Sequence, residues 1–252
     1  MTLADPDVIA LEAISARAWP AARSTSLGGW RLYATSGFSG RINACWPLDD
    51  PGLELAQAVI RAEAWFESCG LPSLFKIVEG AAPALTAELV RRGYHSRTET
   101  VMMTGPARGS PDPSLVLSDV VDPAFAAVFT ASSDDPGDAR ERLETLARVP
   151  APRAFALLEA DAAPAAIGAC AVEGDWAGVF AMRTAPRYRR RGLARRVFAS
   201  LLAYAAELGA RGVWLQVEAD NTAALALYQA AGFAEAYRYR YWFRPAPPHG
   251  VL

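Results

Sequence analysis

Two stretches of this chain, 139 residues apart, repeat the same succession of helices, strands and glycines. Shifting the first stretch by 139 residues places the helical pattern at 53–69 on that at 192–208, and places Gly70 on Gly209, without a gap. The segment LFKIVE then falls on VWLQVE. Few residues are identical, so the correspondence rests on hydrophobic periodicity and turn residues. A gapless match of this kind predicts an internal duplication in which each half builds the same α/β unit.

The segment 108–114, RGSPDPS, is dense in residues that interrupt helices and strands. It predicts a division into a first domain over 1–107, a linker over 108–113 and a second domain over 114–252. In the second domain, hydrophobic periodicity predicts strands that alternate with helices. The strands are expected at 114–119, 153–161, 164–175, 176–185, 212–219 and 234–243, and the helices at 122–132, 138–149, 193–208 and 221–231.

The composition limits which classes of protein and which cellular locations fit this chain. The chain has 252 residues, 52% of them apolar, which is enough for a large buried core. It contains no apolar run of 18 residues and begins without the pattern of a secretory signal, so we expect a cytoplasmic protein with no membrane partner. Three widely spaced cysteines and only two histidines form no metal-binding pattern, so no metal is expected.

The segment RYRRRGLARR, residues 187–196, is unusual in a chain with a formal net charge of −2. Seven arginines and no acidic residue lie between Arg183 and Arg196. The segment joins a predicted strand to a predicted helix, and a helix N-terminus presents unpaired N–H groups and the positive end of the helix dipole. Gly192 allows a ligand to approach the backbone, and the guanidinium groups add donors that suit phosphate oxygens. The pattern therefore predicts a site for an anion.

Other interpretations of this segment were weighed against the anion site. The chain lacks G-x-x-x-x-G-K-[ST], and it lacks G-x-G-x-x-G after a strand, which excludes a nucleotide-hydrolysing loop and the dinucleotide fingerprint. Nucleic-acid binding normally requires a basic face, which the mildly acidic total disfavours. An ordinary basic loop with a glycine turn stays open. The preceding strand has no acid to hold a magnesium ion, which points to a phosphate that is held rather than transferred.

Two motifs in the second half resemble the signatures of one enzyme superfamily. The run Arg189-Arg190-Arg191-Gly192-Leu193-Ala194 resembles the R/Q-x-x-G-x-G/A pyrophosphate loop of the GNAT superfamily of acyl-CoA-dependent N-acyltransferases. Downstream, residues 221–233 are similar to its second signature, N-x-x-A-x-x-L-Y-x-x-x-G-F. The resemblance covers residues 114–243. It implies an α/β fold with a mixed, mostly antiparallel central sheet flanked by helices, with splayed strands, here duplicated in tandem.

The resemblance also implies where acetyl-CoA, the expected co-substrate, is held. Its pantetheine arm is expected in the gap between the strand before the loop and the strand after the following helix, against Met182, Arg183 and Thr184. Its pyrophosphate is expected on the amides of the loop, and Asn221 is expected to orient the cofactor. The loop residues are Arg189, Arg190, Arg191, Gly192, Leu193 and Ala194.

The same family pattern implies catalytic roles for two residues. Tyr228 lies seven residues after Asn221, two turns along the same helix, so both side chains share one helix face. By resemblance Tyr228 is the general acid for the departing thiolate, although a core aromatic at this spacing is the alternative. The attacking amine must be neutral, so a carboxylate or a water held by one is expected to take its proton. Glu218 is the candidate base, with Glu173 as the alternative.

The first half lacks the residues that would bind CoA. The 139-residue shift places Asp50 on Arg189 and Leu53 on Gly192, so the counterpart loop is the acidic PLDDPG. An acidic loop repels phosphate, and this half resembles the non-catalytic N-terminal halves of tandem GNAT proteins. Its cluster of Trp, Arg and Asn side chains either packs the core or forms a wall of the acceptor site. The cluster consists of Trp30, Arg41, Asn43 and Trp46.

Taken together, these features predict an N-acetyltransferase that moves an acetyl group from acetyl-CoA to a primary amine by direct attack. The acceptor is expected to be a small molecule, with specificity set by residues 125–148 and by the first half. No cysteine lies in either motif, which disfavours a covalent intermediate. The alternatives are a protein or peptide N-acetyltransferase and a non-catalytic acyl-CoA-binding sensor. We expect a monomer or weak homodimer that binds no nucleic acid.

Overall fold

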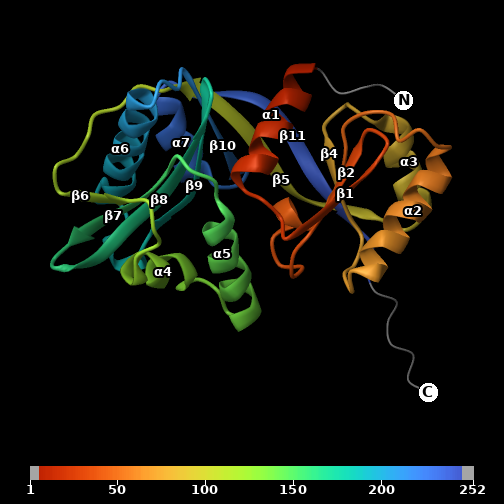
Figure 1. Ribbon diagram of the computed structural model, residues 1–252, viewed down its shortest axis with the longest axis horizontal. Coiled ribbons are helices and arrows are strands. Elements are labelled where there is room, and N and C mark those ends of the chain that lie inside the picture. Colours follow the sequence, from red (N-terminus) through yellow and green to blue (C-terminus); the bar gives the residue numbers. More distant parts are fainter. Residues whose placement is uncertain (1–5, 246–252) are drawn as a thin grey trace.

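The computed structural model describes residues 6–245. They form one sheet with helices packed on both of its faces (Figure 1). The N-terminal half contains α1 (Pro6–Ala18), β1 (Arg23–Leu27), β2 (Trp30–Ala34), the short helix η1 (Gly40–Ile42), β3 (Cys45–Pro47), α2 (Leu55–Ser68), β4 (Leu74–Val78), α3 (Pro83–Arg91) and β5 (His95–Pro106). The C-terminal half contains β6 (Leu115–Ser118), α4 (Pro123–Thr130), α5 (Pro136–Arg148), β7 (Arg153–Ala160), β8 (Ala163–Glu173), β9 (Trp176–Thr184), η2 (Pro186–Tyr188), α6 (Leu193–Glu207), β10 (Gly212–Glu218), α7 (Thr222–Ala230) and β11 (Ala234–Phe243).

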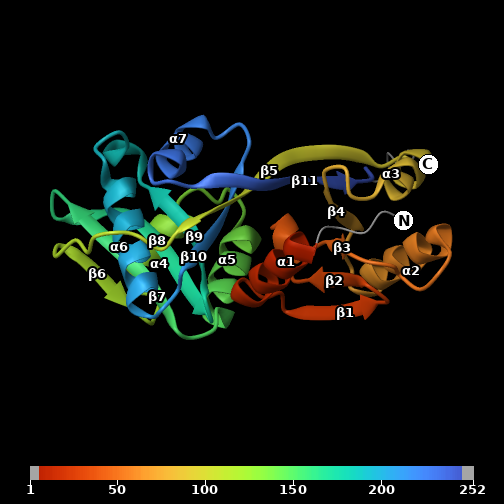
Figure 2. The same ribbon diagram turned by 90° about the horizontal axis from the view of Figure 1, so that it is seen from above.

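The two halves share a single eleven-stranded sheet because they exchange their last strands. The strand order is β1-β2-β3-β4-β11-β5-β10-β9-β8-β7-β6. β5 therefore lies between two strands of the C-terminal half, and β11 lies between two strands of the N-terminal half. Figure 2 shows these two long strands running side by side from one half into the other. The backbone hydrogen bonds that join the halves are thus those of a continuous sheet.

Three hydrophobic clusters hold the helices against this sheet. One face carries α2 and α3 over the N-terminal half and α6 and α7 over the C-terminal half. The other face carries α1, α4 and α5, whose apolar side chains form one cluster with residues from both halves. Trp19, just after α1, packs edge-on against Phe180 of β9 at 5.0 Å between ring centroids. The first helix therefore stabilises the strand that leads to the arginine-rich loop.

The predicted fold class and the order of elements are confirmed. Each strand and helix expected in the second half occurs, with ends that differ by at most two residues. A shift of 139 residues carries β4 onto β10, α3 onto α7 and β5 onto β11, in agreement with the predicted repeat. The structure adds the strand exchange, which hydrophobic periodicity does not encode.

The expected linker is packed against α6. Asp112 pairs with Arg196, with 2.6 Å between Oδ2 and Nε, and its backbone N–H donates to the hydroxyl of Ser200. At Gly109 a Cβ atom would lie 2.0 Å from the carbonyl oxygen of Ala199. The division into domains at 1–107 and 114–252 stays a prediction, because the two parts meet in one sheet.

Candidate active site

Strands β9 and β10 run parallel and then separate. They are paired from Trp176 to Val179 on β9 and from Gly212 to Leu215 on β10, and they share no ladder beyond that point. Ala181 has a φ of +55°, and the register of β8 against β9 shifts at this place. The bulge bends β9 away from β10, because an extra residue on one strand turns it out of the ladder. The expected splay is therefore present, and a backbone edge of β9 faces the gap.

The residues at the end of β9 face alternate sides of the sheet. Met182 turns toward α6, since a Cβ atom added at Gly168 would lie 2.4 Å from its sulfur. Arg183 turns to the opposite face, where its Cζ lies 5.9 Å from the ring centroid of Phe129. The carbonyl of Met182 accepts from Arg183 Nη1 at 3.0 Å. The carbonyl of Thr184 accepts from Arg189 Nε at 3.4 Å.

The loop between η2 and α6 presents a row of free backbone donors. Arg190 and Gly192 have φ of +61° and +76°, and Gly192 is the N-cap of α6 without any side-chain cap. The amide groups from 190 to 194 donate to no acceptor among residues 6–245. Space around the α-carbon of Gly192 is open. Successive free N–H groups at a helix N-terminus form a concavity that suits an anion.

The seven arginines from Arg183 to Arg196 differ in whether an acidic side chain pairs with them. Arg191 forms a bidentate pair with Asp161 on the β7–β8 turn, with N–O distances of 2.8 and 3.3 Å. Arg196 is paired with Asp112. Arg190 has no hydrogen-bond or ion-pair partner among the described residues and is exposed. Of the three loop arginines predicted to add side-chain donors, Arg191 already has an acid partner and contributes its backbone amide to the free row.

The second motif places Asn221 and Tyr228 on α7. Asn221 caps this helix, its Oδ1 accepting from the amide of Ala224 at 3.2 Å. Tyr228 is buried, and its ring centroid lies 5.0 Å from that of Phe198 on α6. Its phenol oxygen has no hydrogen-bond partner among residues 6–245. Burial raises the pKa of Tyr228 to about 12, with the charge of Arg183 acting in the opposite direction. Tyr228 therefore keeps its proton at neutral pH.

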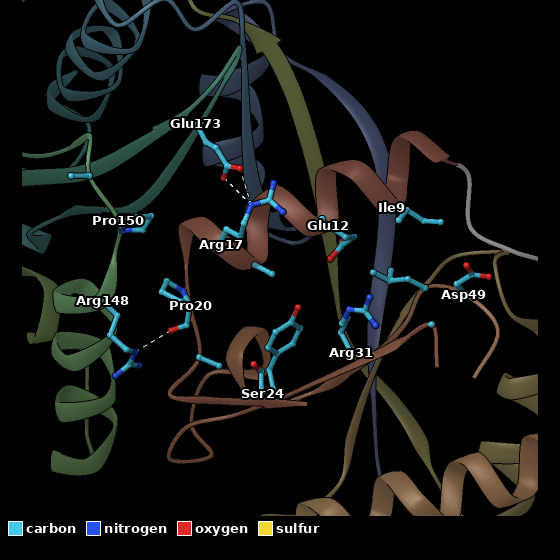
Figure 3. Close-up of a pocket in the computed structure, with 17 residues that line it drawn as sticks. Ile9, Glu12, Arg17, Pro20, Ser24, Arg31, Asp49, Arg148, Pro150 and Glu173 are labelled. Carbon is cyan, nitrogen blue, oxygen red and sulfur yellow. Dashed lines mark hydrogen bonds and ion pairs between the residues drawn. The ribbon is translucent and has the colours of Figure 1, made fainter. Parts of the chain in front are cut away.

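The two candidate bases lie at opposite ends of the strands, on β10 and β8, with β9 between them. Glu218 is the last residue of β10, is exposed and stands at the splay. Glu173 ends β8 and is paired with Arg17 of α1 at 2.8 Å. Glu173 lines a hollow of about 910 Å³ that is formed largely by α1, the β1–β2 hairpin and the turn after α5 (Figure 3). The structure therefore leaves Glu218 as the acid close to the splay.

A loop of the N-terminal half is fastened to α5 of the C-terminal half. The buried carboxylate of Glu141 accepts hydrogen bonds from the amides of Ser36 and Ser39 at 2.7 and 2.6 Å, and from Asn43 Nδ2 at 3.1 Å. The sequence did not indicate this role, because an acidic residue on a helix is normally exposed. Asn43 is thereby structural, and Trp30 and Trp46 are fully buried in the core. Arg41, the fourth member of that cluster, has no ion pair with any described residue.

The counterpart loop of the N-terminal half is already filled by its own side chains. Glu54 caps α2, its carboxylate accepting from the amides of Ala56 and Gln57 at 3.0 and 3.3 Å. Asp49 accepts from the amide of Asp50 at 2.7 Å. Carboxylates thus occupy the donors that phosphate would need, in contrast to the uncapped α6.

The described residues offer no cluster of metal ligands, and the Cys170 thiol is buried. Residues 6–245 contain no group of His, Cys, Asp and Glu that could hold a metal ion. Burial raises the pKa of the Cys170 thiol to about 12, so it stays protonated. Within the same range, every helix is too short or too polar to cross a membrane.

Comparison with solved structures places this arrangement in one fold class. A GCN5-related N-acetyltransferase from Kribbella flavida matches 95% of the chain and 96% of its own, with a TM-score of 0.69 and 17% identity. A tandem GNAT protein from the clavulanic acid biosynthesis pathway matches 95% of the chain and 89% of its own, with a TM-score of 0.62 and 14% identity. These matches show that the chain shares the fold of these GNAT proteins.

Sequence comparison gives the family. The family model described as "Probable histone acetyltransferase Rv0428c C-terminal" matches residues 6–242. The chain belongs to this family, and through it to the GNAT superfamily of N-acetyltransferases. An uncharacterized N-acetyltransferase, YobR of Bacillus subtilis, is 26% identical over 93% of this chain and 98% of its own length. The [ribosomal protein bS18]-alanine N-acetyltransferase of Salmonella typhimurium is 40% identical over 36% of this chain and 62% of its own length.

Proposed function

We propose that this enzyme transfers an acetyl group from acetyl-CoA to the primary amine of a small molecule by direct attack in a ternary complex. The observation that carries the proposal is the row of free amides from 190 to 194, at an uncapped helix start beside the splayed strands. That row can hold the pyrophosphate, with Arg189 and Arg190 adding charge. The free edge of β9 at Met182, Arg183 and Thr184 can pair with the pantetheine amides.

The chain supplies groups for both proton transfers of this reaction. Tyr228, whose pKa is raised by burial, holds the proton that the CoA thiolate needs as it leaves. Glu218 at the end of β10, directly or through a water, takes the proton of the attacking amine. Glu218 ends β10, and Tyr228 lies close enough to Arg183 of β9 for the charge of Arg183 to act on it, which supports a reacting thioester between these strands. The amide Nδ2 of Asn221 has no partner among the described residues and is available to orient the CoA arm.

Thermal unfolding with and without millimolar acetyl-CoA tests the site. Selective binding to the native state stabilises it by about 2.7 kcal/mol at a hundredfold excess over Kd. We expect a rise of several degrees in the wild-type protein that is lost in Gly192→Asp, because a carboxylate in the loop repels pyrophosphate. Gly52→Asp is the matched control: Gly52 also has a positive φ, +70°, and open space around it, but lies in the N-terminal loop. Its acetyl-CoA shift should persist, whereas an absent shift in the folded wild type would exclude this co-substrate.

A second candidate function is acetylation of a protein or peptide amine. It is favoured by the local similarity to the bS18-alanine N-acetyltransferases, which spans 95 residues. A non-catalytic acyl-CoA sensor is the third candidate, and it requires no proton donor at Tyr228. Release of CoA thiol with a panel of amines and N-terminal peptides separates the three candidate functions.

We further propose that the enzyme is cytoplasmic. We also propose that it is monomeric or weakly dimeric, since the shared sheet already forms an internal pseudo-dimer.

A further inference from the structure

Arginines from three separate elements gather on the α4–α5 face of the sheet, next to the splay. Arg183 projects from β9 and Arg142 from α5, and their Cζ atoms lie 5.9 and 5.7 Å from the ring centroid of Phe129. Arg41 belongs to η1 of the N-terminal half. The Arg183 side chain is exposed at its surface, but the protein packed around it, and then the charges of Arg142 and Arg41, lower its pKa. Arg142 and Arg41 therefore lie close enough to Arg183 for their charges to repel it.

Among the described residues, only one of these three arginines forms an ion pair, although Glu218 and Asp138 lie close enough for their charges to act on Arg183. Arg142 is held by Asp138, whose two oxygens each lie 2.9 Å from its Nε. Arg183 makes a hydrogen bond only to the carbonyl of the preceding residue, at 3.0 Å. Arg41 makes no hydrogen bond or ion pair with residues 6–245. Arg41 and Arg183, which form no ion pair with a described residue, repel each other, and an anion bound between them removes that cost.

Arg41 is presented by a rigid segment of the other half. Its loop is tied to Glu141 by the amides of Ser36 and Ser39, and next to it Gly40 packs so tightly that a Cβ atom would lie 2.9 Å from the ring of Tyr241. The same face of the sheet also offers a neutral donor. Gln216 of β10 accepts from the Tyr239 hydroxyl at 2.7 Å, while its buried Nε2 has no partner. These donors are therefore held in place before any ligand binds.

We propose that Arg41 and Arg183 bind an anionic group of the acetyl acceptor, so that the substrate is an amine that also carries a carboxylate or a phosphate. Guanidinium groups match the oxygens of both anions with paired hydrogen bonds. The inference rests on the proposed function, and it assigns the N-terminal half a part in substrate recognition. Arg41 and Arg183 repel an acceptor that carries several positive charges.

The test compares acceptors that share one amine and differ in the far group: β-alanine, 2-aminoethylphosphonate, 3-aminopropanol and 1,3-diaminopropane. We expect kcat/KM for an anionic acceptor to exceed that for the alcohol by about tenfold or more. Arg41→Gln and Arg183→Gln should each bring this ratio close to one, mainly through KM for the anionic amine. Arg140→Gln is the control, because Arg140 is an exposed cation on α5 without a partner among the described residues, and its ratio should not change.

The two anionic acceptors identify the preferred anion, and a preference for either supports the inference. Equal rates for all four acceptors, a preference for the diamine, or no acetylation of either anionic amine would overturn it. The acetyl-CoA shift in thermal unfolding, measured on the same preparations, separates the two proposals. If the shift is present and the preference absent, the inference alone fails. If the shift is absent in the wild type, the proposed function fails.

Discussion

Glu141 of α5 and Asn43 of the N-terminal half are joined by a hydrogen bond of 3.1 Å, although 98 residues separate them along the chain. The same carboxylate accepts from backbone amides on both sides of the loop tip, at Ser36 and Ser39. This loop of the N-terminal half is thus fixed to α5 by one buried acid, in addition to the exchanged strands that join the two halves. The same loop carries Arg41 to the face of the sheet where we propose that the acceptor binds.

We expect Glu141→Gln to destabilise the protein by about 2–3 kcal/mol. The neutral amide accepts weaker hydrogen bonds than the carboxylate, and its NH₂ group faces donors already present at the site. Urea unfolding measures the loss. Glu144→Gln, on the exposed side of the same helix and without a partner among the described residues, should stay within about 0.5 kcal/mol of the wild type. Equal stability of the two variants would contradict the role given to Glu141.

A buried ion pair under α1 gives a second stability prediction. Lys76 Nζ lies 2.5 Å from Glu12 Oε2, both side chains are almost fully buried, and the ammonium lies 3.8 Å from the ring centroid of Trp46. Lys76→Met leaves the Glu12 carboxylate without its cation and should cost about 3–5 kcal/mol. Combining it with Glu12→Gln removes the unpaired charge and should recover part of that loss. A double mutant less stable than Lys76→Met alone, in the same urea assay, would sink the argument.

The sequence predicted the elements of the C-terminal half because these are local, and the two motifs are equally local patterns. Alternation and helical spacing lie within ten or fifteen residues, and the loop from Arg189 to Ala194 is read from six consecutive letters. The exchange of β5 and β11 was missed because the two long strands give the same periodicity in either half. The ion pair between Arg191 and Asp161 was missed because the two residues lie 30 positions apart in the chain, beyond the reach of a local pattern. Glu141 gave no signal, since nothing in its own helix marks it as buried.

Replacing Tyr228 with Phe tests the proton donor. The phenol touches no hydrogen-bonding partner in the described chain, so Tyr228→Phe should fold normally and retain acetyl-CoA binding. We expect kcat to fall by about 100-fold, the usual scale for loss of a general acid. Steady-state rates with an active acceptor, together with the acetyl-CoA shift in thermal unfolding, separate chemistry from binding. An unchanged kcat would assign Tyr228 to the core alone.

The pH dependence of the wild-type enzyme follows from the same residue. An acid must be protonated to act, and burial raises the pKa of Tyr228 from 10.0 to about 12, so its protonated form persists to higher pH than that of a free tyrosine. We therefore expect kcat to show no descending limb from this residue between pH 7 and pH 10. A descending limb near pH 8 or 9 that disappears in Tyr228→Phe would show that the phenol ionises in the working range.

The pairing of Arg191 with Asp161 predicts how acetyl-CoA affinity can be raised. Asp161 lies on the tight β7–β8 turn with a φ of +53°, a conformation that Asn also tolerates, so Asp161→Asn should keep the turn. The substitution removes a negative charge beside the loop and frees the Arg191 guanidinium, so we expect acetyl-CoA to bind about two- to fivefold more tightly, the scale of one exposed ion pair. Asp175→Asn, on the turn at the opposite end of β8, should leave Kd unchanged. Calorimetric titration measures the Kd for acetyl-CoA at low and high salt. The gain in affinity should shrink at high salt, because salt screens the exposed charges.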